Sequence, residues 1–267
     1  MGKSLLPFTI FFRLLMVEVQ AIRGSYKPQD SNVKLFVFGD SYVDTGNAPK
    51  LSTDSWRKQY GVSYPGKPTG RFSVGCILTD YIEWGEFCLW GTGVFSTMIP
   101  LPNMATQINY FQQLVEKKVH TQNDLDSSIA LISLAGNNYF AYLRKKGSKK
   151  GLPCFAWKLI NQLTLKLKSI HDMGVRKIGV VAIEPLGCLP WFTVPSSVQR
   201  CNRNLDLAAK SHNLRLHRAA HKLRRENNGS VFPQSILFEL MANGGTVKRL
   251  ITEKDLVQEY WPACSLK

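Results

Sequence analysis

The segment VKLFVFGDSYVDTGN, residues 33–47, joins an almost continuous apolar run to a cluster of small and polar residues. Such a run is typical of a β-strand that is buried on both faces of a sheet. Gly39 permits a sharp turn after the strand, so Asp40 and Ser41 follow at its carboxyl end. The segment therefore predicts a parallel α/β sheet with a serine at the edge where such sheets bind ligands.

The rest of the chain alternates between strand and helix patterns. Further apolar runs predict buried strands at 128–135, 177–183 and 235–240. Between them, helical patterns occupy 104–119, 154–173 and 200–226. This alternation predicts one domain at 33–240, built as a mostly parallel sheet with helices on both faces.

The composition limits the classes of partner. The chain has 267 residues and a net charge of +15, which favours anionic partners. Its basic residues are densest at 143–151 and 217–228, and neither cluster has the interleaved aromatic residues of a nucleic-acid surface. We therefore expect no nucleic-acid partner and favour acidic polysaccharide or phospholipid head groups.

The N-terminus has the pattern of a secretory signal peptide at 1–21, with an apolar run at 5–12 and small residues up to Ala21. Arg13 and Glu18 interrupt the pattern, so an N-terminal segment that is not a signal is the alternative. No other stretch approaches the roughly 18 apolar residues of a membrane span. We expect a secreted protein without a transmembrane helix.

Six cysteines occur without a C-x-x-C pair, so no zinc or other metal site is expected. A secretory route allows disulfides, and Cys188 and Cys201, which flank one loop, are the best candidate pair. The sequon at Asn228 is a potential glycosylation site.

Ser41 is a candidate nucleophile. A serine hydroxyl requires a base to take its proton and fixed donors to stabilise the oxyanion that forms. Asn137 follows the second predicted strand and offers two amide hydrogens, while Gly91 offers a backbone N–H that can approach a substrate closely. Ser41, Gly91 and Asn137 are therefore the predicted catalytic residues.

These elements resemble the plant GDSL esterase/lipase family, a branch of the SGNH hydrolases. The blocks are FVFGDSYVDTGN, YPGKPTGRFS, LTDYI, GTGVF, AGNNYF, GVRKIGVVAIEPLGCLP and CNRNLDLAAKSHNLRL. The resemblance that runs through them extends over nearly all of 33–240. The resemblance implies a flavodoxin-like three-layer α/β/α fold and hydrolysis of acyl esters or lipids through Ser41. It also implies an oxyanion hole formed by Ser41, Gly91 and Asn137, and a secreted monomer that needs no metal or cofactor.

The chain departs from this family pattern in several places. No D-x-x-H block, which supplies the base in the family, occurs in the sequence, and 241–267 reads as a divergent tail. Only EWGEFCLW separates LTDYI from GTGVF, where the family carries another strand and helix. Val74 and Asn138 stand where the family has aspartates, which suggests relaxed constraint. We expect a truncated or degenerate member with a sheet that is incomplete at the C-terminus.

Three functional hypotheses remain at this stage. The first is an inactive relative of the secreted esterases, because none of the five histidines is expected near Ser41. The second is an active esterase of which this sequence is a truncated version. The third is a basic protein that binds acidic cell-wall polysaccharide.

Overall fold

The computed structural model describes residues 34–47, 50, 53–81, 85–88, 91–98, 102–193 and 200–227. The chain divides into a unit at 1–32 and a unit at 33–267, and all described residues belong to the second. The expected signal peptide, the strand at 235–240, the tail at 241–267 and Asn228 lie outside the described residues.

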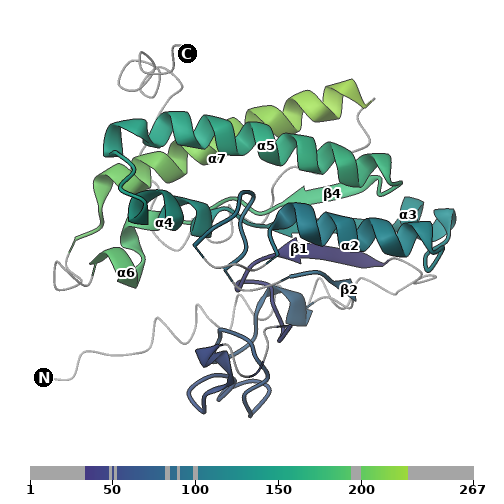
Figure 1. Cartoon of the computed structure of the whole chain (residues 1–267), viewed down its shortest axis with the longest axis horizontal. Helices are drawn as coiled ribbons and strands as arrows, with labels where there is room; N and C mark the ends of the chain where they lie inside the picture. Colours follow the sequence, from purple (N-terminus) through teal and green to yellow (C-terminus); the bar gives the residue numbers. More distant parts are fainter. Residues whose placement is uncertain are drawn as a thin grey trace, which may run out of the picture. The chain divides into compact units, whose positions relative to one another are not determined.

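The centre of the fold is a parallel sheet with the strand order β2-β1-β3-β4 (Figure 1). Its strands are β1 (Leu35–Gly39), β2 (Gly85–Glu86), β3 (Ile129–Ser133) and β4 (Lys177–Val180). The chain passes from β1 to β2 on one side of it, and then crosses back over β1 to β3 on the other side. This is the flavodoxin-like order, in which ligands bind between the carboxyl ends of the first and third strands. The predicted parallel α/β sheet is confirmed.

The segment EWGEFCLW was expected to lack the strand that the family carries there, but the structure places the short strand β2 in it. Gly85 and Glu86 pair in parallel with Phe36 and Val37 of β1. Sequence reasoning missed β2 because two residues are too few to show a strand pattern. In the described residues of the connection from β1 to β2, the helical elements are the 3-10 helices η1 (Asp54–Trp56) and η2 (Leu78–Tyr81).

The three predicted helices are confirmed as α2 (Met104–Glu116), α5 (Leu152–Asp172) and α7 (Arg203–Glu226). The structure adds shorter helices that were not predicted: α3 (Gln122–Ser127), α4 (Gly136–Arg144) and α6 (Pro190–Thr193), with the 3-10 turns η3 (Lys149–Gly151) and η4 (Leu186–Cys188). Asn103 caps α2 as predicted, since its side chain accepts a hydrogen bond from the Thr106 N–H at 3.1 Å. None of the helices in the described part of the chain combines the length and hydropathy needed to cross a bilayer.

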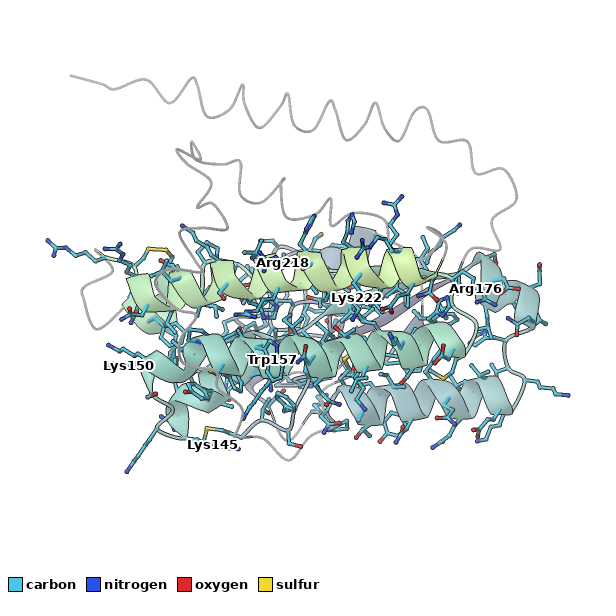
Figure 2. The ribbon with its side chains drawn as sticks, turned by 90° about the horizontal axis from the view of Figure 1, so that it is seen from above. Lys145, Lys150, Trp157, Arg176, Arg218 and Lys222 are labelled. Carbon is cyan, nitrogen blue, oxygen red and sulfur yellow. A yellow bond between two sulfur atoms is a disulfide. The ribbon has the colours of Figure 1, made fainter. Side chains whose placement is uncertain are left out.

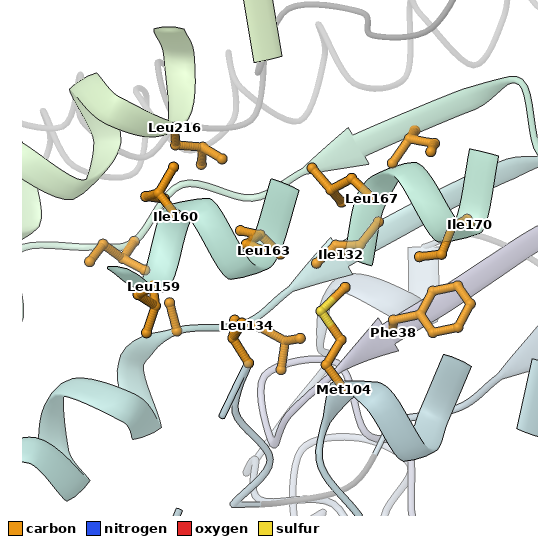
Figure 3. Close-up of a cluster of buried hydrophobic side chains, with 14 of the residues drawn as sticks. Phe38, Met104, Ile132, Leu134, Leu159, Ile160, Leu163, Leu167, Ile170 and Leu216 are labelled. Carbon is orange, nitrogen blue, oxygen red and sulfur yellow. The ribbon is translucent and has the colours of Figure 1, made fainter. Parts of the chain in front are cut away.

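The main core lies on one face of the sheet. Phe36 and Phe38 of β1 and Ile132 of β3 point to this face, where α2 and α5 cover them and α7 packs against α5 (Figures 1–3). The helices contribute fully buried side chains such as Met104, Leu159, Leu163, Leu167 and Ile170. A smaller cluster on the opposite face contains Leu35, Val37 and Leu131, together with Val43 and Cys88 from loops. This alternation along β1 is what a strand buried on both faces requires.

A disulfide joins Cys188 to Cys201, as predicted. It ties the loop that follows β4 to the start of α7. By limiting the freedom of the unfolded chain, a cross-link over 13 residues stabilises the fold by about 3 kcal/mol.

We therefore expect the double variant Cys188→Ser/Cys201→Ser to unfold at lower urea concentration, with a loss of roughly 2–4 kcal/mol in the free energy of unfolding. The exposed free thiol of Cys76 provides the control. Cys76→Ser should leave the midpoint unchanged, and equal midpoints for all three proteins would show that the cross-link contributes nothing.

Candidate functional site

Ser41 lies at the tip of a turn that Asp40 organises. The Asp40 carboxylate accepts a hydrogen bond from the Tyr42 N–H at 3.1 Å, and the Asp40 C=O accepts one from the Val43 N–H, also at 3.1 Å. Asp40 is buried, whereas Ser41 is half-buried. In the described part of the chain, the Ser41 hydroxyl has no hydrogen-bond partner. The turn thus presents a serine hydroxyl that is open to a ligand.

Gln107 of α2 holds the end of β1 in place. Its side-chain carbonyl accepts a hydrogen bond from the Gly39 N–H at 3.0 Å, and its amide donates to the Gly39 C=O at 2.9 Å. The same amide donates to the Thr92 hydroxyl at 3.3 Å. Gln107 is fully buried, so it links the serine turn to the loop at 91–98 through one rigid side chain.

Asn138 positions the loop at 91–98. Its side-chain oxygen accepts a hydrogen bond from the Val94 N–H at 2.7 Å, and its amide donates to the Phe95 C=O at 3.2 Å. A Cβ at Gly93 would lie 2.6 Å from the Asn138 amide, so the close approach requires glycine there. An ionised aspartate at this position could accept from the Val94 N–H but could not donate to the Phe95 C=O, so the second hydrogen bond depends on the amide of Asn138.

Asn137, at the start of α4, brings the predicted site residues together. Its amide donates to the Asp40 carboxylate at 3.2 Å and to the Thr92 C=O at 3.0 Å. Thr92 follows Gly91, so the segments that carry Ser41, Gly91 and Asn137 meet at the carboxyl edge of β1 and β3. Both amide hydrogens of Asn137 are engaged, so a substrate oxyanion must share or displace one of these acceptors.

The site is electrostatically unusual. Burial is the main cause that raises the pKa of Asp40 to about 7, and the charge of Glu184 raises it further. Glu184, which follows β4, accepts a hydrogen bond from the Tyr42 hydroxyl at 2.7 Å. Burial and this carboxylate raise the pKa of Tyr42. This hydrogen bond links the serine turn to the residues after β4, and sequence reasoning missed it because the two positions are 142 residues apart.

The five histidines lie away from this site. His120 contacts Lys34 and Phe36 at the amino end of β1, and His171 lies in the last turn of α5. His217 and His221 are exposed on α7, as expected. His212 is fully buried, and its Nδ1 lies 3.2 Å from the Tyr139 hydroxyl. Burial lowers the pKa of His212 to about 3. In the described residues, none of the five has a hydrogen bond or ion pair with Ser41, Asp40 or Asn137.

One group in the described residues has metal-ligand types close together: Cys188, Cys201 and Asp206. The two sulfurs are bonded to each other, so neither is available as a thiolate ligand. Asp206 instead accepts a hydrogen bond from the Gly187 N–H at 2.8 Å. The cluster is structural: it fixes the loop after β4 on α7.

Replacing Gln107 tests whether it organises the site. We expect Gln107→Leu to lower the free energy of unfolding by roughly 2–4 kcal/mol, because it leaves the buried Gly39 N–H and C=O without partners. Urea unfolding monitored by circular dichroism measures this. Gln113→Leu changes an exposed glutamine of the same helix, and a loss no larger than that of this control would contradict the role of Gln107.

Asp40 should give stability a specific pH dependence. Its pKa is higher in the folded protein than in the unfolded chain, so the folded state binds more protons between about pH 4 and 7, and stability falls as pH rises through this range. Asp40→Asn should remove this fall, so its melting temperature should rise relative to the parent protein with increasing pH. His212, whose pKa is lowered, acts in the opposite direction in both proteins and cancels. Parallel curves for the two proteins would exclude a raised pKa.

Comparison with known proteins places this geometry in a family. The profile of the GDSL-like lipase/acylhydrolase family matches residues 35–249. A GDSL esterase/lipase of Arabidopsis thaliana is 41% identical over 77% of this chain and 67% of its own length. A second from the same plant is 38% identical, over 82% of this chain and 69% of its own. A GDSL lipase of Tanacetum cinerariifolium is 27% identical over 78% of this chain and 65% of its own.

The matched region contains the whole described sheet and the loops that carry Ser41, Gly91 and Asn137. This agrees with the resemblance that the sequence blocks indicate, and the chain belongs to the GDSL-like lipase/acylhydrolase family.

Proposed function

We propose that this chain carries the acyl-binding part of an ester hydrolase site, with Ser41 as the nucleophile and with Gly91 and Asn137 as oxyanion donors. The observation that carries this proposal is the pair of hydrogen bonds from the Asn137 amide to Asp40 and to Thr92, which joins the three loops. Donors held in advance at the point where charge develops are the main source of catalysis in acyl transfer. The substrate class is a carboxylic ester of a small molecule or a lipid.

We further propose that the chain by itself hydrolyses esters slowly. All five histidines belong to the described residues, and the contacts of His120, His171 and His212 are with residues outside the site. A serine without a base retains about 10³- to 10⁴-fold acceleration over water from the oxyanion hole and binding alone. This supports a site that binds and weakly activates an ester.

The alternative is an active esterase in which additional sequence supplies an Asp-x-x-His segment. The coverage of 67% and 69% of the two Arabidopsis thaliana relatives favours this alternative. In that protein, the histidine of the added segment would accept the proton of the Ser41 hydroxyl. The organisation of the three loops would be the same.

We also propose that the protein is a secreted monomer. The signal-like pattern at 1–21 supports secretion, and the Cys188–Cys201 disulfide fits an oxidising compartment. Neither observation depends on whether the site turns over esters.

Added imidazole should act as the missing base. We expect the purified chain to hydrolyse a short-chain nitrophenyl ester slowly, and imidazole to raise the part of the rate that depends on Ser41. The rate of the Ser41→Ala variant at each imidazole concentration measures direct attack by imidazole and is subtracted. Asn137→Ala should lower the rescued rate by about 10²- to 10³-fold, the usual effect of losing one oxyanion donor.

Two outcomes would contradict the proposal. Fast, saturable turnover without imidazole that vanishes in Ser41→Ala would show that this chain contains its own base. A rescued rate that is the same in Ser41→Ala would show that the site does not hold an ester near Ser41. A version extended by a relative's Asp-x-x-His segment tests the alternative, since it should need no imidazole.

A further inference from the structure

A basic groove runs between α5 and α7, and none of its lining residues comes from the loops that carry Ser41, Gly91 and Asn137. The hollow has a volume of about 280 Å³. Its walls include Trp157 and Lys168 of α5 and Arg215, Arg218 and Lys222 of α7 (Figure 2). The lining residues extend from Trp157 to Lys168 along α5 and from Arg215 to Glu226 along α7. At 1.5 Å per residue each wall is about 16 Å long, so the groove is elongated. Its shape suits a linear chain better than a compact ligand.

The groove carries an excess of positive charge. Among the described residues that line it, four side chains are cationic and Glu226 is the one carboxylate. Glu226 pairs with Lys168 at 3.1 Å and more loosely with Lys222 at 3.8 Å. The cations of α7 at positions 215, 218 and 222 share one face, because residues three and four apart are neighbours on a helix. They form a row about 10 Å long at the helical rise of 1.5 Å per residue.

Two of these cations lie close together. Burial is the main cause that lowers the pKa of Arg215, and the charge of Arg218 lowers it further. A carboxylate beside either of them could accept paired hydrogen bonds from its guanidinium group. The groove therefore matches a ligand with repeated carboxylates along its length.

Trp157 adds an apolar surface beside the row of cations. Its side chain is 43% exposed although it is large and aromatic. An exposed aromatic ring beside cations can stack on the apolar face of a sugar ring, whereas a single ring is too few for the successive base stacking of single-stranded nucleic acid.

From these observations, we propose that the groove between α5 and α7 binds a linear polysaccharide that bears carboxylates. Its cations pair with the uronate groups, and Trp157 packs against a sugar ring. This site goes beyond the ester site and would hold the protein on an acidic polymer.

The test measures binding of polygalacturonate to the full chain carrying Ser41→Ala, so that the result does not depend on ester chemistry. We expect saturable binding at low ionic strength that weakens at about 0.15 M salt. The double variant Arg218→Gln/Lys222→Gln should bind about tenfold more weakly, as expected for two lost ion pairs. Trp157→Ala should weaken binding several-fold without changing the net charge.

The matched control is Lys58→Gln/Lys67→Gln, which removes the same charge from exposed lysines outside the groove. We expect this control to bind as the parent does. An equal loss in both double variants would overturn the proposal, since binding would then follow net charge alone. Tighter binding of anionic vesicles or single-stranded DNA, reduced by the same groove variants, would show that the partner class is wrong.

Discussion

The structure of the site depends on side-chain amides at the carboxyl edge of the sheet. They form hydrogen bonds with backbone N–H and C=O groups where the pairing between strands ends. Gln107 satisfies both backbone groups of Gly39, and Asn138 satisfies the Val94 N–H and the Phe95 C=O. Beyond the end of β4, Asn213 of α7 accepts a hydrogen bond from the Ile183 N–H at 3.0 Å and donates one to the Ile183 C=O at 2.8 Å. A carboxamide is suited to this role because it offers a donor and an acceptor together. Each amide fixes a loop that leaves the sheet, so the loops are part of the rigid fold.

This arrangement separates two requirements of ester hydrolysis. The proposed nucleophile and oxyanion donors lie on loops that Gln107 and the start of α4 hold in place by hydrogen bonds. The base has no comparable support in the described residues, because the histidines serve other parts of the fold. Asp40 accepts a hydrogen bond from the Asn137 amide, although its burial disfavours the charged form of the carboxyl group. A ligand that takes over the Asn137 amide must therefore compete with Asp40.

The sequence predicted the sheet and the long helices because their signals are local. The strand at 35–39, the Asn103 cap and the long pattern of α5 can be read from neighbouring residues. The positions of Ser41 and Asn137 followed from the rule that parallel strands end at one edge. The role of Gln107 could not be predicted, because its partner Gly39 is 68 residues away and glutamine in a helix is usually exposed. The role of the Asn138 amide could not be predicted for the same reason, since it depends on the distant Phe95 C=O.

Hydrogen exchange of individual backbone amides tests the central claim most directly. If the side-chain amides make these loops part of the core, the N–H groups of Gly39, Val94 and Ile183 should exchange only through global unfolding, with the same opening free energy as the amides of β3. Exchange of these three groups at much lower opening free energy than β3 would contradict the account, because the loops would then open independently of the sheet.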